Sequence, residues 1–323
     1  MQHTHLGRSG LQVSRLCLGT MNFGPKTDEA EAHIIMDRAR EAGINFFDTA
    51  NVYGWGENKG WTEKIVGRWF AKGGGRREDT VLATKLYGSM SDRPNDTFLS
   101  ALNIRRALDA SLTRLQTDYI DLYQFHHIDR NTPWDEIWQA MDVAVQQGKI
   151  IYNGSSNFAG WHIAQAQESA RRRNFTGLVS EQSIYNLINR EVELEVIPAA
   201  QQYGLGLLPW SPLQGGLLGG VLKQAEEGGR RTEGRAAESL RIHREAIGRY
   251  EDLADELGIA PGVLALAWLL HQPAVAAPIT GPRTLRQLDD ALLALDVELD
   301  ADALAKLDVI FPGHKPAPED YAW

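Results

Sequence analysis

Short apolar runs alternate with stretches of helical periodicity along most of the chain. Runs of this length, bounded by glycine and polar residues, predict buried β-strands, and the periodic stretches predict amphipathic helices. The predicted strands are residues 15–19, 45–48, 80–85, 120–126, 150–156, 178–182, 205–210 and 274–280. The predicted helices are residues 29–41, 57–72, 103–115, 134–147, 161–173, 191–203, 241–257, 261–270, 284–295 and 301–310.

The regular alternation of strand and helix indicates a parallel sheet, because each helix returns the chain to the end of the sheet at which the next strand begins. Eight such units in roughly 250 residues predict a closed (β/α)8 TIM barrel. No linker divides residues 1–323, so one domain is expected, with a small β-hairpin around residues 7–10 and an extra C-terminal helix at residues 301–310. An open doubly wound sheet is the alternative, but residues 19–24 lack the G-x-G-x-x-G pattern that follows its first strand.

Composition narrows the possible function classes. The formal net charge of −9 argues against general binding to nucleic acid, which needs clustered Lys and Arg. Cys17 is the single cysteine, so no disulfide can form within the chain, as is typical of a reducing cytoplasm. Residues 263–270 are too short an apolar run to cross a bilayer, and the N-terminus lacks an apolar signal region. We therefore expect a cytoplasmic protein with no nucleic-acid or membrane partner and no obligatory protein partner.

Polar side chains end three successive predicted strands. Asp48, Lys85 and His126 follow one another at intervals of 37 and 41 residues, about one strand–helix unit each. Barrel active sites are built at the carboxyl ends of strands, so these three side chains should converge. Tyr53 follows Asp48 closely and can fold back over them. Each residue alone could be a structural polar group at the barrel rim, but the four together favour a catalytic site.

These four residue types suit proton delivery to a developing alkoxide. Tyrosine is a weak acid with a reference pKa of about 10, and the Lys85 ammonium would lower the pKa of Tyr53 by favouring the phenolate. Asp48 can keep Lys85 protonated, and His126 can donate a hydrogen bond to a carbonyl oxygen. None of these residues is a hydride source, so an organic cofactor must supply the hydride. His127 should point to the opposite side of its strand, and no histidine cluster has the spacing of metal ligands.

Longer motifs surround this constellation. They are Asp48-Thr49-Ala50 with Tyr53-Gly54, Ala83-Thr84-Lys85, and residues 118–126, 154–158, 181–186 and 209–213. With these motifs the chain resembles the aldo-keto reductase superfamily over nearly its whole length, and is most similar to the bacterial branch related to potassium-channel β subunits. The resemblance implies a (β/α)8 barrel and NADPH-dependent reduction of aldehyde or ketone carbonyls to alcohols. It also implies a catalytic tetrad of Asp48, Tyr53, Lys85 and His126, with Tyr53 as the proton donor.

The resemblance further implies which residues hold NADPH or NADP+. Ser156, Asn157 and Gln182 are similar to contacts with the nicotinamide carboxamide, and Trp210 takes the place of the aromatic that stacks on the ring. The other implied contacts are Gly19, Thr20 and Met21 at the ribose, Ser211, Leu213 and Gly216 along the pyrophosphate, Arg283 and Gln287 at the 2′-phosphate, and Asp48, Pro212, Leu217, Gly281 and Asp290 nearby. Asp290 is included because the family often has asparagine where this chain has Ala291. Arg283 could instead be an ordinary surface residue at a helix start.

The substrate pocket is expected among the loop aromatics and imidazoles, namely Phe23, Trp55, Tyr87 and His127, together with Trp210. Seven glycines and many mixed charges between residues 213 and 240 predict a long mobile loop on the face of the barrel that binds the ligands. The small-molecule carbonyl substrate itself is not identified by the sequence. A cofactor-binding regulatory subunit with little turnover stays open as an alternative. A lyase or isomerase also stays open, because a fold does not fix a function.

Overall fold

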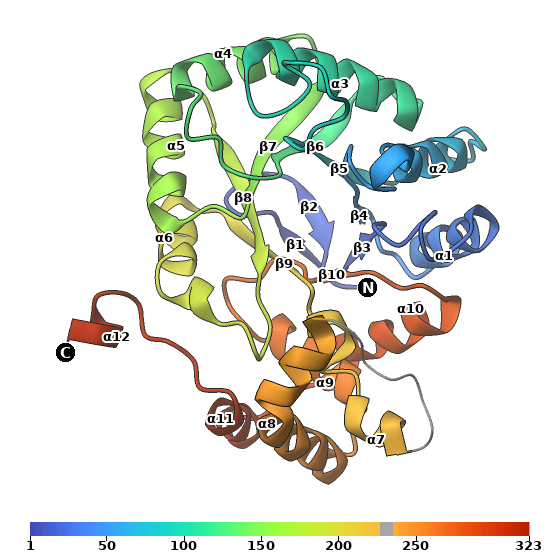
Figure 1. Ribbon diagram of the computed structural model, residues 1–323, viewed down its shortest axis with the longest axis vertical. Helices are drawn as coiled ribbons and strands as arrows, with labels where there is room; N and C mark the ends of the chain where they lie inside the picture. The colour runs from blue at the N-terminus through green and yellow to red at the C-terminus, as the bar shows by residue number, and fades with distance from the viewer. Residues whose placement is uncertain (227–234, 323) are drawn as a thin grey trace.

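The computed structural model describes residues 1–226 and 235–322 and contains an eight-stranded parallel barrel (Figure 1). Its strands are β3 (Cys17–Gly19), β4 (Phe46–Asp48), β5 (Val81–Leu86), β6 (Ile120–Phe125), β7 (Ile150–Ser156), β8 (Leu178–Ile184), β9 (Gly206–Trp210) and β10 (Ile279–Thr280). They pair in the order β10-β3-β4-β5-β6-β7-β8-β9. Leu207 makes backbone hydrogen bonds to Ala274 (3.0 Å) and Ala276 (2.9 Å), which joins β9 to the segment before β10. The predicted (β/α)8 fold is confirmed.

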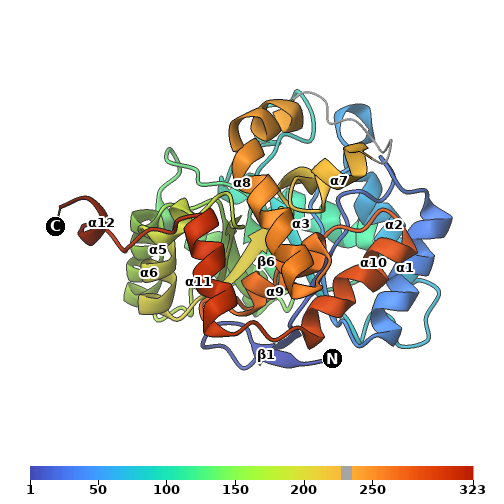
Figure 2. The same ribbon diagram turned by 90° about the horizontal axis from the view of Figure 1, so that it is seen from below.

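Helices follow the strands and surround the barrel (Figures 1 and 2). They are α1 (Glu29–Glu41), α2 (Trp61–Phe70), α3 (Ala101–Leu115), α4 (Trp134–Gln146), α5 (Gly160–Arg172), α6 (Val196–Tyr203), α7 (Val221–Glu226), α8 (Arg235–Leu257), α9 (Pro261–Leu270), α10 (Leu285–Leu292), α11 (Ala301–Ile310) and α12 (Glu319–Ala322). Short 3-10 helices lie at Gly56–Asn58, Glu191–Glu193, Gln214–Gly216 and Leu293–Asp296. The predicted extra helix is α11, and Figure 1 shows the chain running on from it, away from the barrel, to α12.

The predicted N-terminal hairpin is present as β1 (His3–His5) and β2 (Gln12–Ser14), which pair antiparallel. Leu6 and Val13 are fully buried against Cys17 and Phe46, the first residues of β3 and β4. The hairpin therefore covers the amino ends of these strands and leaves the carboxyl ends of the barrel for a functional site. Cys17 is buried in this cluster, and burial raises the pKa of its thiol, so it stays protonated.

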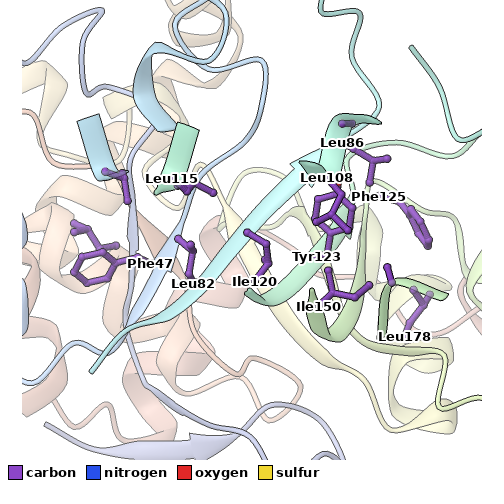
Figure 3. Packing of buried hydrophobic residues seen from close by; sticks show 14 of the residues in the cluster. Phe47, Leu82, Leu86, Leu108, Leu115, Ile120, Tyr123, Phe125, Ile150 and Leu178 are labelled. Carbon is purple, nitrogen blue, oxygen red and sulfur yellow. The ribbon is translucent and has the colours of Figure 1, made fainter. Parts of the chain in front are cut away.

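A larger apolar layer lies between the strands and the outer helices. Figure 3 shows side chains of this layer, among them Leu82, Ile120 and Tyr123 from the strands and Leu108 and Leu115 from α3. Full burial of one such aliphatic side chain contributes about 1.5–3 kcal/mol to stability. Because strand residues alternate between the barrel interior and this layer, packing on the outside fixes which side chains point inward.

Two predicted helices are divided in the structure. Residues 57–72 form a 3-10 turn and then α2, because Gly60 takes a left-handed conformation (φ 83°) before α2 begins. Residues 191–203 form a second 3-10 turn and then α6. Pro198 lies in the first turn of α6, where a residue without a backbone N–H is tolerated. Both segments contain a helix as predicted, and the local backbone conformation sets the residue at which each α-helix begins.

The segment 213–240 is more helical than predicted. Val221 begins α7 and packs with Leu217 and Ile247, and α8 begins at residue 235 instead of 241. The rest of the expected loop falls on residues 227–234, which lie outside the described residues. Across the described ranges no single helix is long and apolar enough to cross a membrane. Among the described residues, Ala237–Leu257 of α8 and the whole of α9 reach that length and composition as a pair, and they meet at a bend of 88°.

Candidate active site

The side chains of Asp48, Lys85 and Tyr53 meet in a buried cluster next to the carboxyl ends of β4 and β5. Lys85 is fully buried, and its ammonium carries three N–H donors. These donors reach Asp48 Oδ2 (2.5 Å), the Thr49 carbonyl oxygen (2.9 Å) and the Tyr53 hydroxyl oxygen (3.2 Å). The structure therefore brings together three of the four predicted tetrad residues through one ammonium group.

Two glutamines hold the second oxygen of the Asp48 carboxylate. Gln124 and Gln182 donate their side-chain amides to Asp48 Oδ1 at 3.0 and 2.9 Å, and Gln182 also donates to Gln124 Oε1 at 3.2 Å. A buried carboxylate needs such partners, because an unpaired buried charge is strongly unfavourable. Sequence reasoning missed Gln124. The available signal was a polar amide inside a buried strand, two residues before His126.

Burial dominates the ionisation of the phenol. It raises the pKa of Tyr53, and the charge of Lys85 only partly offsets this rise. Burial also acts to lower the pKa of Lys85, but Asp48 and Tyr53 outweigh it, so the pKa of Lys85 is raised. The predicted lowering of the Tyr53 pKa is therefore wrong, because the buried phenolate would lose its hydration. At neutral pH the site holds a protonated phenol beside a protonated amine.

His126 lies beside Tyr53 as a neutral imidazole. The two rings are 6.1 Å apart, edge to face. Burial, together with the charge of Lys85 and the neighbouring His127, lowers the pKa of His126 to about 2. A neutral imidazole keeps one N–H that can donate to a ligand oxygen. All four predicted catalytic side chains therefore lie near one another at the carboxyl ends of β4, β5 and β6.

His127 does not point away from His126 as predicted. The two rings stack at 5.2 Å with 5° between their planes, so they lie on the same side of the chain. The prediction was wrong because β6 ends at Phe125, and the alternation of side chains applies only within a strand.

The residues expected at the nicotinamide lie at the carboxyl ends of β7, β8 and β9, which are adjacent in the sheet. Asn157 donates to the His126 carbonyl oxygen (3.1 Å) and to Ser156 Oγ (3.0 Å), and its Oδ1 atom accepts from Trp210 Nε1 (3.1 Å). Gln182 directs its amide N–H groups to Asp48 and Gln124, so its Oε1 atom is the group it can offer a ligand. These amides and hydroxyls have the chemistry that a carboxamide needs.

Buried Glu181 anchors the loop that carries Asn157, and sequence reasoning missed it. Its carboxylate accepts from Ser155 Oγ (2.5 Å), Ser183 Oγ (2.7 Å) and the Phe158 backbone N–H (3.0 Å). Burial raises the pKa of Glu181 to about 7 against the opposing effect of these donors. A carboxylate within an otherwise buried strand was the signal that the sequence offered.

The remaining candidate contacts follow β3 and β9. Gly19 ends β3, and Thr20 and Met21 follow it. Thr20 Oγ1 donates to the Asp48 carbonyl oxygen (2.9 Å), and Met21 is 46% exposed. After β9 come the residues Ser211, Pro212, Leu213, Gly216 and Leu217. Ser211 (φ 55°) and Gly216 (φ 100°) both have positive φ, which makes a tight turn there. Leu217 is buried, so it could meet a ligand only through its backbone.

Arg283, Gln287 and Asp290 are exposed together at the start and on one face of α10. Gln287 Oε1 accepts from the Arg283 backbone N–H (2.8 Å), which fixes the turn and leaves the guanidinium in solvent. Gly281, just before this turn, accepts from Asn22 through its carbonyl oxygen (2.7 Å). Asp290 lies 3.7 Å from the Arg286 guanidinium, whereas Ala291 is buried in the core.

Four of the residues expected at the substrate pocket have different environments. Phe23 is fully buried in the outer core, so we leave it out of the proposed substrate contacts. Trp55 is 49% exposed, with its ring 5.6 Å from the Tyr53 ring. Tyr87 packs edge to face on His127 at 5.3 Å. Phe98, which sequence reasoning missed, also packs edge to face on Tyr87, at 5.3 Å.

One family model and several known proteins are similar to this chain over nearly its whole length. The family model described as "Aldo/keto reductase family" matches residues 15–311. The chain is 55% identical to the uncharacterized oxidoreductase YrpG of Bacillus subtilis over 100% of both chains. It is 35% identical to a probable voltage-gated potassium channel subunit beta of Oryza sativa, over 99% of this chain and 100% of the relative. It is 33% identical to the versiconal hemiacetal acetate reductase of Aspergillus parasiticus, over 98% and 100%.

Proposed function

The chain belongs to the aldo/keto reductase family, and we propose that it reduces aldehyde or ketone carbonyls to alcohols with NADPH. Relatives named as an oxidoreductase and a reductase support carbonyl reduction as the general activity. The observation that carries the proposal is the line of contacts from Asp48 through the Lys85 ammonium to the Tyr53 hydroxyl. A buried, protonated phenol held by a cation is a suitable proton donor.

Each tetrad residue has a distinct part in this proposal. Tyr53 gives its proton to the carbonyl oxygen as that oxygen becomes an alkoxide, and Lys85 stabilises the phenolate that is left. Asp48 balances the charge of Lys85 and orients it. Neutral His126 donates its N–H to the same carbonyl oxygen. A positioned general acid of this kind contributes roughly 10²–10⁴-fold to the rate.

The donor set fits a nicotinamide nucleotide, which supplies the hydride when it is bound. We propose that Ser156, Asn157 and Gln182 hold the carboxamide and that Trp210 packs on the ring. Exposed Arg283 would bind the 2′-phosphate, because a guanidinium is a multiple N–H donor and the start of α10 adds positive potential. On this reasoning the chain prefers NADPH to NADH.

A carbonyl screen tests this function. The protein is mixed with NADPH and with sugars, aromatic aldehydes or dicarbonyl compounds, and the loss of NADPH absorbance is followed. We expect consumption that depends on the carbonyl compound. A cofactor-binding regulatory subunit would instead bind NADPH and consume none with any carbonyl compound; this alternative is kept because the Oryza sativa relative is named as a channel subunit. Turnover without any nicotinamide would instead support a lyase or isomerase.

A further inference from the structure

The turn that follows β9, residues 211–216, is held in an unfavourable backbone conformation. Ser211 and Gln214 have φ values of 55° and 47°, which residues other than glycine rarely adopt. Such residues cost free energy and persist only where the surrounding structure holds them in place. The β9 turn comes directly after Trp210, the residue proposed to pack on the nicotinamide ring. The backbone strain therefore lies next to the proposed cofactor site.

One buried side chain contacts both of these strained residues. Asn186 lies just after β8 and is fully buried. Its Nδ2 atom donates to the Ser211 carbonyl oxygen (2.9 Å) and to Gln214 Oε1 (3.2 Å). Its Oδ1 atom accepts from the backbone N–H groups of Ile188 and Asn189, at 2.9 Å each. The Asn186 amide therefore joins the segment after β8 to the β9 turn and uses both its donor and its acceptor atoms.

The β9 turn is open at its two glycines. Gly215 and Gly216 are exposed, and among the described residues no atom beyond their chain neighbours lies within 4 Å of the place a Cβ would take. Without side chains, these residues let a ligand approach the backbone closely. Backbone N–H groups in a turn of this kind form a concave site for a phosphate group. Asn186 fixes the buried side of the turn, which gives the open side a defined shape.

We propose that Asn186 is a positioning residue that holds the β9 turn in the conformation that binds the pyrophosphate of NADPH. This inference rests on the proposed use of NADPH. Asn186 acts through the backbone of Ser211, so its loss should weaken cofactor binding and leave proton transfer from Tyr53 intact. The position requires an amide, because the same side chain must donate to the β9 turn and accept from Ile188 and Asn189, whereas a carboxylate only accepts.

Asn186→Asp tests the inference. Aspartate keeps the acceptor for Ile188 and Asn189 but places an oxygen, instead of Nδ2, against the Ser211 carbonyl oxygen. We expect the Kd for NADPH, measured by quenching of tryptophan fluorescence, to rise about tenfold, as for one lost hydrogen bond. The Kd for adenosine 2′-phosphate, which has no pyrophosphate, should stay constant. Single-turnover reduction at saturating NADPH should keep its wild-type rate. A general loss of folding would instead weaken binding of both nucleotides.

A second variant and a matched control complete the test. Gln214→Ala removes the other acceptor of Asn186 Nδ2 at a half-buried residue, and should raise the Kd for NADPH about threefold. Asn103→Asp is the control, because buried Asn103 donates Nδ2 to the carbonyl oxygen of Phe98 (2.7 Å), which also has a positive φ of 64°. It should leave the Kd for NADPH unchanged. An unchanged Kd in either Asn186→Asp or Gln214→Ala, or an equal rise in Asn103→Asp, would overturn the inference.

The binding measurements need no carbonyl compound, so they separate this inference from the reductase function. The expected rises in the Kd for NADPH, with no turnover of any carbonyl compound, would reject the reductase and keep the role of Asn186. Carbonyl reduction by the wild type, with the same Kd for NADPH in wild type and Asn186→Asp, would keep the reductase and reject the role of Asn186.

Discussion

Replacement of Asp48 by asparagine isolates the buried ion pair on which the site depends. The Lys85 and Asp48 side chains are 0% and 4% exposed, with 2.5 Å between Lys85 Nζ and Asp48 Oδ2. Asparagine keeps the size of the side chain but removes its charge, so a buried ammonium loses its counter-ion. Removing one partner of a buried pair costs about 3–5 kcal/mol. We expect the free energy of unfolding at pH 7 to fall by about 3 kcal/mol, since the amide oxygen can still accept one hydrogen bond.

The pH dependence of this loss has a definite sign. In the wild type the pKa of Lys85 is raised, so its stabilising contribution is complete below the unfolded lysine pKa of about 10.4 and is lost as the pH rises through the folded value. In Asp48→Asn, burial is left to lower the pKa of Lys85, so the unfolded chain binds the proton more tightly and stability rises toward that pH. The difference between the two proteins should therefore shrink from pH 7 to about pH 10.

Urea denaturation followed by tryptophan fluorescence at several pH values measures both effects. Asp48→Asn combined with Lys85→Met should recover most of the lost stability, because it removes both buried charges. Glu63→Gln is the matched control, since Glu63 pairs with Arg114 (2.7 Å) and is fully buried. Its loss should stay constant with pH, because arginine does not deprotonate. Unchanged stability of Asp48→Asn at pH 7, or a loss that is equally constant with pH, would show that the buried ion pair does not stabilise the fold in this way.

Three further predictions concern the cofactor, the carboxylate and the loop anchor. Arg283→Ala should reduce the ratio of kcat/KM with NADPH to that with NADH about tenfold or more, because a charge-assisted hydrogen bond contributes about 1.5–3 kcal/mol. An unchanged ratio, or an equal effect of the control substitution Arg286→Ala at another exposed arginine, rejects the role of Arg283 in binding the 2′-phosphate. Gln124→Leu should lower kcat about tenfold by removing a hydrogen bond worth about 1.5 kcal/mol from Asp48, and should leave the KM for NADPH nearly unchanged; an equal loss in Gln167→Leu, a buried glutamine bonded to Leu178, contradicts this. Because the pKa of Glu181 is raised to about 7, its contribution to stability should fall from pH 4.5 to 7, so the wild type should lose stability relative to Glu181→Gln over this range in urea denaturation; a stability difference that is constant with pH contradicts the assignment.

The fold was predictable because alternation of strand and helix is a property of the local sequence. The convergence of Asp48 and Lys85 followed from the same pattern, since strand ends meet at one edge of a barrel. The direction of the Tyr53 pKa could not be read from residue types. It depends on how completely the phenol is buried, which is a property of the packed structure.

Other features depended on where a strand ends or on what a side chain packs against. The direction of His127 follows from the end of β6 at Phe125, and the burial of Phe23 follows from core packing. Gln124 contacts Asp48 on another strand, and Phe98 contacts Tyr87 across a loop. The linear sequence does not show either contact. The predicted start of the helix at residue 57 was wrong, because Gly60 takes a left-handed conformation just before α2 begins.

We propose that the hydroxyl group of Tyr53, 3.2 Å from Lys85 Nζ, delivers the proton to the carbonyl oxygen. Single-turnover reduction by Tyr53→Phe loaded with NADPH tests it most directly, because the substitution removes only that hydroxyl. We expect NADPH affinity within about threefold of the wild type and a reduction rate lower by roughly 10²–10⁴-fold. Reduction at the wild-type rate by a variant that binds NADPH normally would show that Tyr53 is not the proton donor.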